Sequence, residues 1–162
     1  MRRAVIIDVV RSPFGRGRSG GALDGVHPVD LYAQVLQALV RRTGIDPAMV
    51  EDVITGCVIQ VAEQSGNIGR QAVLAAGFPE RVPAVTLDRK CGSAQQAMDF
   101  AAQGVIAGAY DLVIAGAVAP RSSAAMARRC DSSANASIAS RPIPQRAAIS
   151  SADTPWRTRP WG

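Results

Sequence analysis

Apolar and polar positions in residues 1–118 follow two alternating patterns, short runs of β-branched residues and longer stretches with helical spacing. Runs of the first kind are typical of buried strands. They predict strands over residues 4–10, 53–61, 84–87 and 111–118. The second kind predicts helices over residues 28–42, 67–76 and 91–108. Because strands and helices alternate, the pattern predicts an α/β fold, a mostly parallel sheet with helices on both faces.

Proline and glycine fix the ends of these predicted helices. Pro28 suits the first helical position, where its missing N–H has no helical partner. Gly44 and Gly77 follow the last periodic residues of two helices, as a left-handed terminating residue would. Asp46 and Pro47 predict a short additional turn of helix before the second strand.

Residues 119–162 differ in kind from the rest of the chain. They are rich in Ala, Ser, Arg and Pro, and their only large aliphatic residues besides Met126 are Ile138, Ile143 and Ile149. Neither a period of 2 nor one of 3.6 is visible, which is typical of irregular chain. We therefore predict two regions, a partial α/β domain over residues 1–118 and an irregular basic tail over residues 119–162.

The charge of the chain lies in this tail. Residues 1–118 carry equal numbers of basic and acidic side chains, so the tail accounts for the formal net charge of +5. A nucleic-acid-binding arm in the tail is a weaker alternative, because it has no repeated motif and no structured platform. We predict no nucleic-acid partner.

Other composition signals bound the class of protein. The three cysteines, Cys57, Cys91 and Cys130, are odd in number and lack metal-like spacing, so we predict neither a disulfide framework nor a Cys-based zinc site. No apolar run approaches the ~20 residues of a membrane span. The apolar run near the N-terminus is broken by Asp8 and Arg11, too early for a signal peptide. We expect a cytoplasmic protein without a membrane partner.

Cys91 is the residue with the clearest chemical potential. It follows the charged turn Asp88-Arg89-Lys90, between a predicted strand and a predicted helix. Unpaired amides and the positive dipole end of the helix favour a thiolate there, and Arg89 and Lys90 would add to this effect if they lie nearby. In parallel sheets, sites form beyond the C-terminal ends of strands. The sequence supports a covalent nucleophile, with a buried structural cysteine as the alternative.

Ordered motifs in residues 3–118 resemble the N-terminal part of the thiolases, the acetyl-CoA acetyltransferase and 3-ketoacyl-CoA thiolase family. The segments that carry the resemblance are RSPFG (11–15), GCVIQ (56–60), NIGRQA (67–72), AGFP (76–79), CGSAQQA (91–97) and GAYDLVIAG (108–116). The fold that this implies is an incomplete thiolase-like layered fold.

The resemblance implies a role for Cys91. In the family, the matching cysteine accepts an acyl group as a thioester, then passes it to CoA in thiolysis or to an acetyl-CoA carbanion in Claisen condensation. The backbone N–H of Cys91 would contribute to the oxyanion hole. Coenzyme A thioesters are then substrates, and we expect no cofactor and no metal. The family also implies a homo-oligomer, a dimer or tetramer.

The sequence departs from the family pattern after the last strand. Residues 116–123 lack the family's Gly-Gly-x-Glu-x-Met-Ser. Three later residues of the family pattern are also missing: the Asn that orients water, the His that deprotonates the nucleophile, and the second Cys that acts as acid and base on the substrate. His27, the only histidine, precedes the first helix and is interpreted as structural. We therefore expect little or no activity from this chain alone, and a reading-frame shift near Val118 is our hypothesis for the tail.

Two alternatives to a truncated acyltransferase stay open. One is a non-catalytic chain that binds a full-length thiolase homologue. The other is a related condensing enzyme of the ketoacyl-synthase type, although the segments around Phe14 and Asn67 fit a thiolase better.

Overall fold

The computed structural model describes residues 2–15 and 20–118. Along the described chain lie helix α1 (Pro28–Thr43), the 3₁₀ turn η1 (Pro47–Met49), strand β1 (Asp52–Gly56), the 3₁₀ turn η2 (Ala62–Gln64), helix α2 (Ile68–Ala75), strand β2 (Ala84–Leu87), helix α3 (Ser93–Ala107) and strand β3 (Val113–Ala117). The predicted tail over residues 119–162 lies outside the described residues.

The three strands form one parallel sheet in the order β2-β1-β3, which confirms the predicted α/β class. The register pairs Ile54 of β1 with Val85 on one side and with Ala115 on the other. Since the strands are parallel, β1 and β2 both end at the same edge of the sheet.

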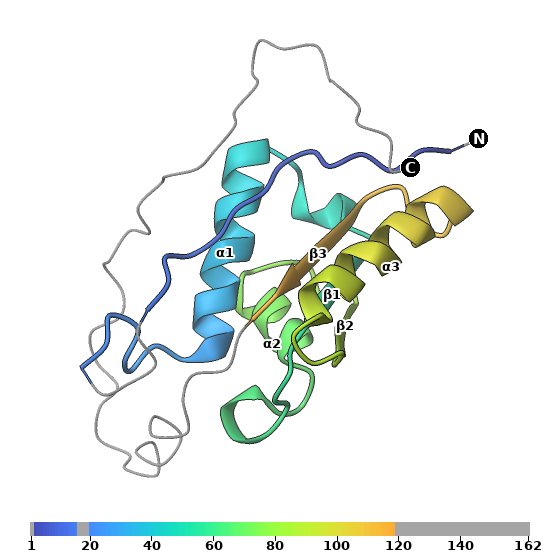
Figure 1. The fold of residues 1–162 in the computed structure, drawn as a ribbon. Helices are drawn as coiled ribbons and strands as arrows, with labels where there is room; N and C mark the ends of the chain where they lie inside the picture. Colours follow the sequence, from blue (N-terminus) through green and yellow to red (C-terminus); the bar gives the residue numbers. More distant parts are fainter. Residues whose placement is uncertain (1, 16–19, 119–162) are drawn as a thin grey trace.

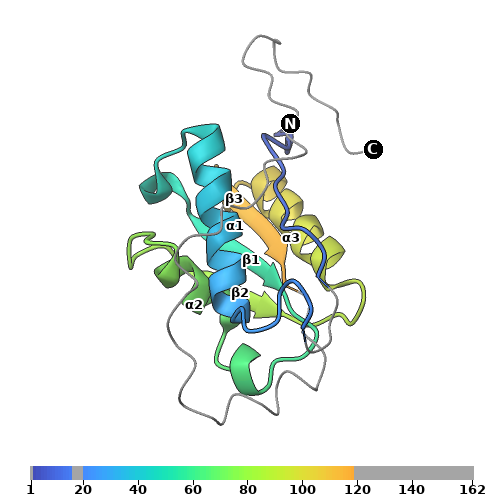
Figure 2. The ribbon, with the colours of Figure 1, turned by 90° about the vertical axis from the view of Figure 1, so that its left-hand side faces the viewer.

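Helices cover both faces of this sheet, as predicted (Figures 1 and 2). Successive residues of β1 point to opposite faces. Val53 therefore packs into the larger core, beside α1 and α2, with Leu36, Ile68 and Val73. Ile54 packs on the other side against Ala97 and Ala101 of α3.

Local chemistry explains where the helices end. The His27 side chain accepts a hydrogen bond from the amide of Val29 and caps α1, with Pro28 at the first helical position. Gly44 follows α1 with a left-handed φ of 68°, and its amide donates to the Val40 carbonyl. The predicted ends of this helix are confirmed to within one residue.

The predicted strand over residues 53–61 is shorter in the structure. β1 ends at Gly56, and the Cys57 amide makes one more bond to the Leu87 carbonyl, at 2.9 Å. Strand β2 ends at Leu87, so the backbone beyond Cys57 has no strand beside it. The chain then turns through η2 toward α2.

The prediction of a buried strand over residues 4–10 is wrong. The segment is extended, but its backbone makes no hydrogen bond to any described strand. Four of its apolar side chains, Val5, Ile6, Ile7 and Val9, are 45–59% exposed. Ion pairs of Arg2 with Asp111 and of Asp8 with Arg42 attach it to the rest of the fold. A β-branched run alone cannot form a strand without a neighbouring backbone to pair with.

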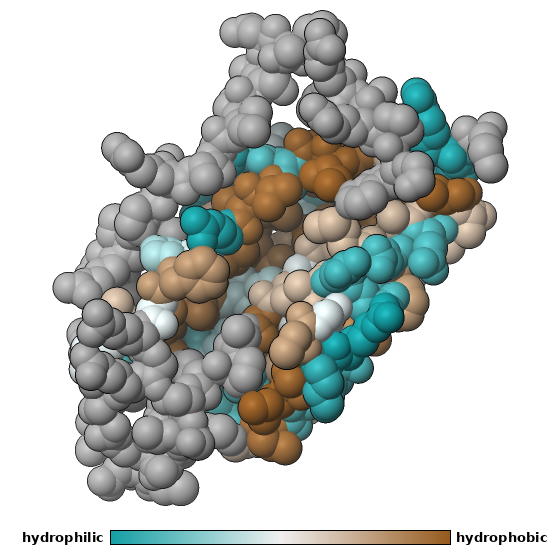
Figure 3. Space-filling view, in the orientation of Figure 1, coloured by the Kyte–Doolittle hydropathy of each residue, from teal (hydrophilic) through white to brown (hydrophobic). Residues whose placement is uncertain are grey.

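A cavity of about 750 Å³ separates this segment from β3. Figure 3 shows the hollow on the face that Figure 1 presents, with many hydrophobic residues around it. Its apolar lining includes Ile7, Val9, Leu39, Met98, Val105 and Ile114. The outer edge of β3 therefore faces a gap rather than another strand.

Candidate active site

Cys91 lies where the sequence predicts it, just beyond β2 and just before α3. Three residues separate it from Leu87, the last residue of β2, and Ser93 begins the helix. Its side chain is exposed and its thiol is free. The site is thus at the edge where β1 and β2 end, open to a molecule approaching from solvent.

The start of α3 gives this position its electrostatic character. Gly92 is the N-cap residue and provides no side-chain hydrogen bond, so no side chain blocks the helix start. Among the described residues, the amides of Cys91, Ala94 and Gln95 have no acceptor. Unpaired amides and the dipole of a 15-residue helix attract negative charge at its N-terminus.

The charged side chains beside Cys91 are engaged elsewhere. The Lys90 ammonium pairs with a carboxylate oxygen of Asp88 at 2.6 Å, and the Arg89 guanidinium donates to the Gln96 side chain. The hydrogen bonds from Lys90 hold the pKa of the Asp88 carboxyl below its usual range. No contact of Arg89 or Lys90 with the Cys91 thiol therefore supports the expectation that their positive charges favour a thiolate.

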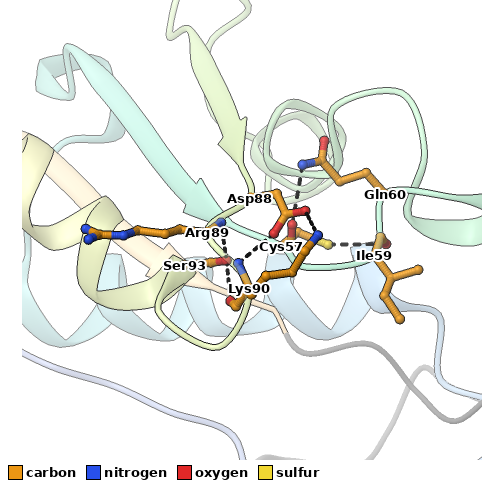
Figure 4. Close-up of polar contacts among 7 residues, drawn as sticks. All are labelled: Cys57, Ile59, Gln60, Asp88, Arg89, Lys90 and Ser93. Atoms are coloured by element: carbon orange, nitrogen blue, oxygen red, sulfur yellow. Dashed lines mark hydrogen bonds and ion pairs between the residues drawn. The ribbon is translucent and has the colours of Figure 1, made fainter.

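The backbone before Cys91 is held by Ser93. Its hydroxyl accepts a hydrogen bond from the Arg89 amide at 2.9 Å and donates one to the Lys90 carbonyl at 2.6 Å. Figure 4 shows these bonds beside those of Asp88, whose other carboxylate oxygen accepts from the Lys90 amide. Sequence reasoning missed Ser93, because a serine at a helix start is an ordinary capping residue and predicts no contact with the preceding turn.

Cys57 lies at the same sheet edge and has the opposite character. It is fully buried, its thiol donates to the Gln64 side chain at 3.2 Å, and Gln64 is itself buried. Burial raises the pKa of the Cys57 thiol, so the neutral form is favoured. Cys57 is therefore a core residue.

The segment NIGRQA (67–72) contributes to the site through the contacts between α2 and β2, not through a reactive side chain. Asn67 caps α2 by accepting from the Arg70 amide, and its side-chain amide donates to the Ala84 carbonyl of β2. The Thr86 hydroxyl donates to the same Asn67 oxygen and accepts from the Gly69 amide. This network attaches α2 to β2, the strand that leads to Cys91.

His27 does not reach the candidate site by any hydrogen bond, and its capping contact confirms a structural role. Within residues 2–15 and 20–118, no group of three or more His, Cys, Asp or Glu side chains could hold a metal ion. In the same part of the chain, no helix is long and apolar enough to cross a membrane.

Comparison with known proteins agrees with this arrangement. The family model for the thiolase N-terminal domain matches residues 4–150. The chain belongs to the thiolase family. Its helix α3 and the cysteine before it are part of the region that this thiolase model matches.

Individual thiolases give the degree of similarity. The chain is 53% identical over 118 residues to a steroid 3-ketoacyl-CoA thiolase of Mycobacterium tuberculosis, and 46% identical over 119 residues to a β-ketoadipyl-CoA thiolase of Escherichia coli. Among solved structures, an acetyl-CoA acetyltransferase of Bacillus anthracis is 44% identical, with a TM-score of 0.67 over 72% of this chain.

These similarities cover only part of each relative. The chain spans 28% of the M. tuberculosis thiolase, and 29% of each of the E. coli and B. anthracis proteins. The site described here therefore lies in a region that makes up less than a third of each of these relatives.

Proposed function

We propose that this chain takes part in thiolase-type acyl transfer between CoA thioesters, with Cys91 accepting the acyl group. The observation that carries the proposal is the contrast between two cysteines at one sheet edge. Cys91 is exposed at the start of α3, whereas Cys57 is buried. A nucleophile must reach its substrate, and only Cys91 of these two can do so.

The chemistry balances without a change of oxidation state. The Cys91 thiol gives up its proton as its sulfur attacks the carbonyl carbon of an acyl-CoA, a new carbon–sulfur bond forms, the bond to the CoA sulfur breaks, and the departing CoA thiolate takes up a proton. In thiolysis of a 3-ketoacyl-CoA, the carbon–carbon bond breaks instead, and the departing acetyl-CoA carbanion takes up a proton. A second CoA, or an acetyl-CoA carbanion, then removes the acyl group from sulfur. CoA is thus a substrate, and these steps use no further cofactor or metal.

The unpaired amide of Cys91 fits the demand of the intermediate. Attack on the thioester places negative charge on the carbonyl oxygen, and a fixed N–H donor stabilises that charge. The first turn of α3 adds its dipole in the same place. The family pattern needs a second donor, from a glycine in the C-terminal half of whole thiolases.

Acid–base chemistry would come from other groups. The family's later Asn, His and second Cys have no counterpart in these 162 residues, where His27 is the only histidine and caps α1. We therefore propose that this chain alone forms the acyl-enzyme slowly and does not turn over. Its activity in a complete site would require groups from further polypeptide.

Association with a longer thiolase is a second candidate function. The exposed apolar segment 4–10 and the open edge of β3 favour it, because monomeric proteins usually cover such edges. Homo-oligomers are the related proposal, since the family forms dimers and tetramers. Co-purification with a full-length thiolase, compared with an unrelated protein of similar size, tests this candidate.

Acetyl-CoA is the direct probe of the first proposal. Incubation should add at most one acetyl group per chain, which peptide mapping should locate on Cys91, with one CoA released for each acetyl group. Cys91→Ser should abolish this label, while Cys57→Ser, at the buried cysteine, should retain it. Equal labelling of Cys91→Ser and the unmodified protein would overturn the role of Cys91, and repeated turnover would overturn the proposed inertness.

A further inference from the structure

The turn between β2 and α3 has a demanding backbone conformation. The chain leaves Leu87 and enters the helix at Ser93, with only five residues between them. Within this turn, Lys90 has a φ of 50°, in the left-handed region that residues with a Cβ adopt at a cost. Lys90 directly precedes Cys91, so whatever holds Lys90 also sets the direction in which Cys91 leaves the turn.

The Ser93 hydroxyl uses both of its hydrogen-bonding functions on this turn. It accepts from the Arg89 amide and donates to the Lys90 carbonyl, so it holds the two residues that directly precede Cys91. Ser93 is only 3% exposed, and water therefore competes little for these bonds. Cys91 lies between the residues that the hydroxyl holds and Ser93 itself.

These bonds do not serve the helix. A capping serine accepts from an amide in the first turn of its own helix, whereas the Ser93 hydroxyl bonds backward, to residues before α3. The N-cap residue of α3 is Gly92, which makes no side-chain bond. The hydrogen bonds of Ser93 therefore stabilise the turn that carries Cys91 and leave the amides of the helix start free.

Ser93 is in turn fixed by close packing on β1. A Cβ at Gly56 would lie 2.6 Å from the Ser93 carbonyl carbon and 2.8 Å from the Ala94 amide nitrogen, so the backbone of α3 would have to shift to admit it. The absence of a side chain at Gly56 lets the first turn of α3 rest on the end of β1. The hydroxyl of Ser93 is thereby held against the rigid sheet.

Asp88 holds the same turn from the solvent side. Its carboxylate accepts from the Lys90 amide at 2.7 Å and pairs with the Lys90 ammonium. Exposed ion pairs of this kind contribute little to stability, since water and salt compete with them. The buried hydroxyl of Ser93 is therefore the stronger of the two restraints.

We propose that Ser93 is a positioning residue for Cys91, a role that rests on the proposed function of Cys91 as nucleophile. Its hydroxyl fixes the strained turn and so holds the thiol beside the unpaired amides at the start of α3. Loss of the hydroxyl leaves Lys90 free to leave the left-handed region, which moves the thiol away from these amides. Displacements of about 1 Å can lower the rate of a positioned reaction by about 100-fold.

Labelling of Cys91 by iodoacetamide tests the proposal on the full chain, at one fixed neutral pH, with peptide mapping to separate the cysteines. Ser93→Ala should slow labelling of Cys91 by roughly tenfold or more, because the thiol is then no longer held in one position at the start of α3. Ser93→Thr keeps the hydroxyl and should restore most of the rate. In concentrated urea all variants should label at one rate, since the turn no longer exists.

Thr43→Ala is the matched control for stability. The Thr43 hydroxyl donates to the Leu39 carbonyl at 2.9 Å near the end of α1, so its loss also removes a side-chain-to-backbone bond. It should leave Cys91 labelling unchanged, and Ser93→Ala should retain a folded circular dichroism spectrum. Where Ser93→Ala does not fold, Ser93→Thr carries the test, because it retains the hydroxyl and should label Cys91 at nearly the unmodified rate.

The outcomes separate the two proposals. Labelling of Ser93→Ala within twofold of the unmodified rate, or faster, overturns the positioning role. Failure of Ser93→Thr to restore the rate also overturns it, because the hydroxyl would then not be the active group. Fast iodoacetamide labelling of the unmodified protein without any acetyl transfer from acetyl-CoA overturns the proposed function of Cys91 and leaves the comparison of Ser93 variants valid.

Discussion

Tyr32 is a titratable residue that lies inside the core. It lies on the inner face of α1, 3% exposed, and its hydroxyl oxygen accepts a hydrogen bond from the Thr55 hydroxyl of β1 at 3.2 Å. Burial raises the pKa of Tyr32 to about 12, because the tyrosinate would lose its hydration. A polar group thus joins helix and sheet inside the core without carrying charge at neutral pH.

This pKa predicts a specific loss of stability at high pH. An unfolded tyrosine ionises near pH ~10, so the unfolded chain releases this proton first as the pH rises. The stabilisation is complete below about pH 10 and falls as the pH approaches 12. Urea unfolding should show the unmodified protein losing roughly 2 kcal/mol relative to Tyr32→Phe over this range.

The phenylalanine variant controls for all other titrating groups, including Tyr110, which it retains. At neutral pH it should be less stable than the unmodified protein, because the buried Thr55 hydroxyl loses its acceptor. Parallel stability curves for the two proteins up to pH ~12 would contradict the burial of a neutral tyrosine.

At the scale of elements, helix α3 and strand β1 meet through a glycine. Gly56, the last residue of β1, lies against the backbone of Ser93 and Ala94. Helix and strand approach this closely only where one of them lacks a side chain. The contact sets the distance between α3 and the sheet, and with it the position of Cys91 relative to the end of β1.

Gly56→Ala should therefore affect stability and reactivity together. The added methyl group would force α3 away from β1 and lower the free energy of unfolding by about 1–3 kcal/mol. Labelling of Cys91 by iodoacetamide should slow in parallel. Gly92→Ala is the matched control, because a Cβ there meets its nearest neighbour, the Arg89 carbonyl oxygen, at an ordinary 3.4 Å. Equal melting temperatures for the two variants would contradict the close contact.

The elements also show how far the sequence predicts this fold. The three helices and strands β2 and β3 lie close to the predicted ranges, because caps such as Pro28 and Gly44 act locally and packing does not override them. The segment 4–10 has an equally strong strand pattern, but a strand also needs a paired neighbour, which local sequence does not reveal. Met98 and Val105 belong to the apolar pattern that predicts α3, yet their side chains line the cavity. The pattern therefore predicts the helix without showing what its apolar face packs against.

The candidate site, too, could be predicted from the sequence only in part. The position of Cys91 beyond a strand and before a helix follows from local pattern, and the structure has it there. The contacts of Ser93, the close approach at Gly56 and the engagement of Arg89 with Gln96 depend on how the turn closes on the sheet. Such contacts join residues through tertiary packing, and one sequence carries no pattern for them.

At the scale of the whole molecule, one side of the fold is covered and the other is open. Helices α1 and α2 cover their face of the sheet, and α3 covers part of the other face (Figure 2). Beyond β3, the cavity and the exposed segment 4–10 leave apolar surface accessible to solvent. Surfaces of this kind, with an open strand edge beside them, are prone to association.

We therefore expect the chain to self-associate, or to aggregate, as its concentration rises. Replacing Ile6 or Val9, which are 52% and 59% exposed, with Lys should reduce this association by adding charge to the segment. Leu74→Lys on α2 is the control, because Leu74 is 44% exposed but does not line the cavity. Sedimentation velocity over a range of concentrations measures the effect, and a concentration-independent monomer with a sharp melt would contradict it.

The gap beside β3 also has a consequence for the order of folding. Residues 4–10 precede α1 in the chain, yet no described strand pairs with their backbone. Elements α1 to β3 can form their contacts with each other before that segment docks. The segment would then be the last of the described elements to be secured, and it would depend longest on chaperones that bind exposed aliphatic segments.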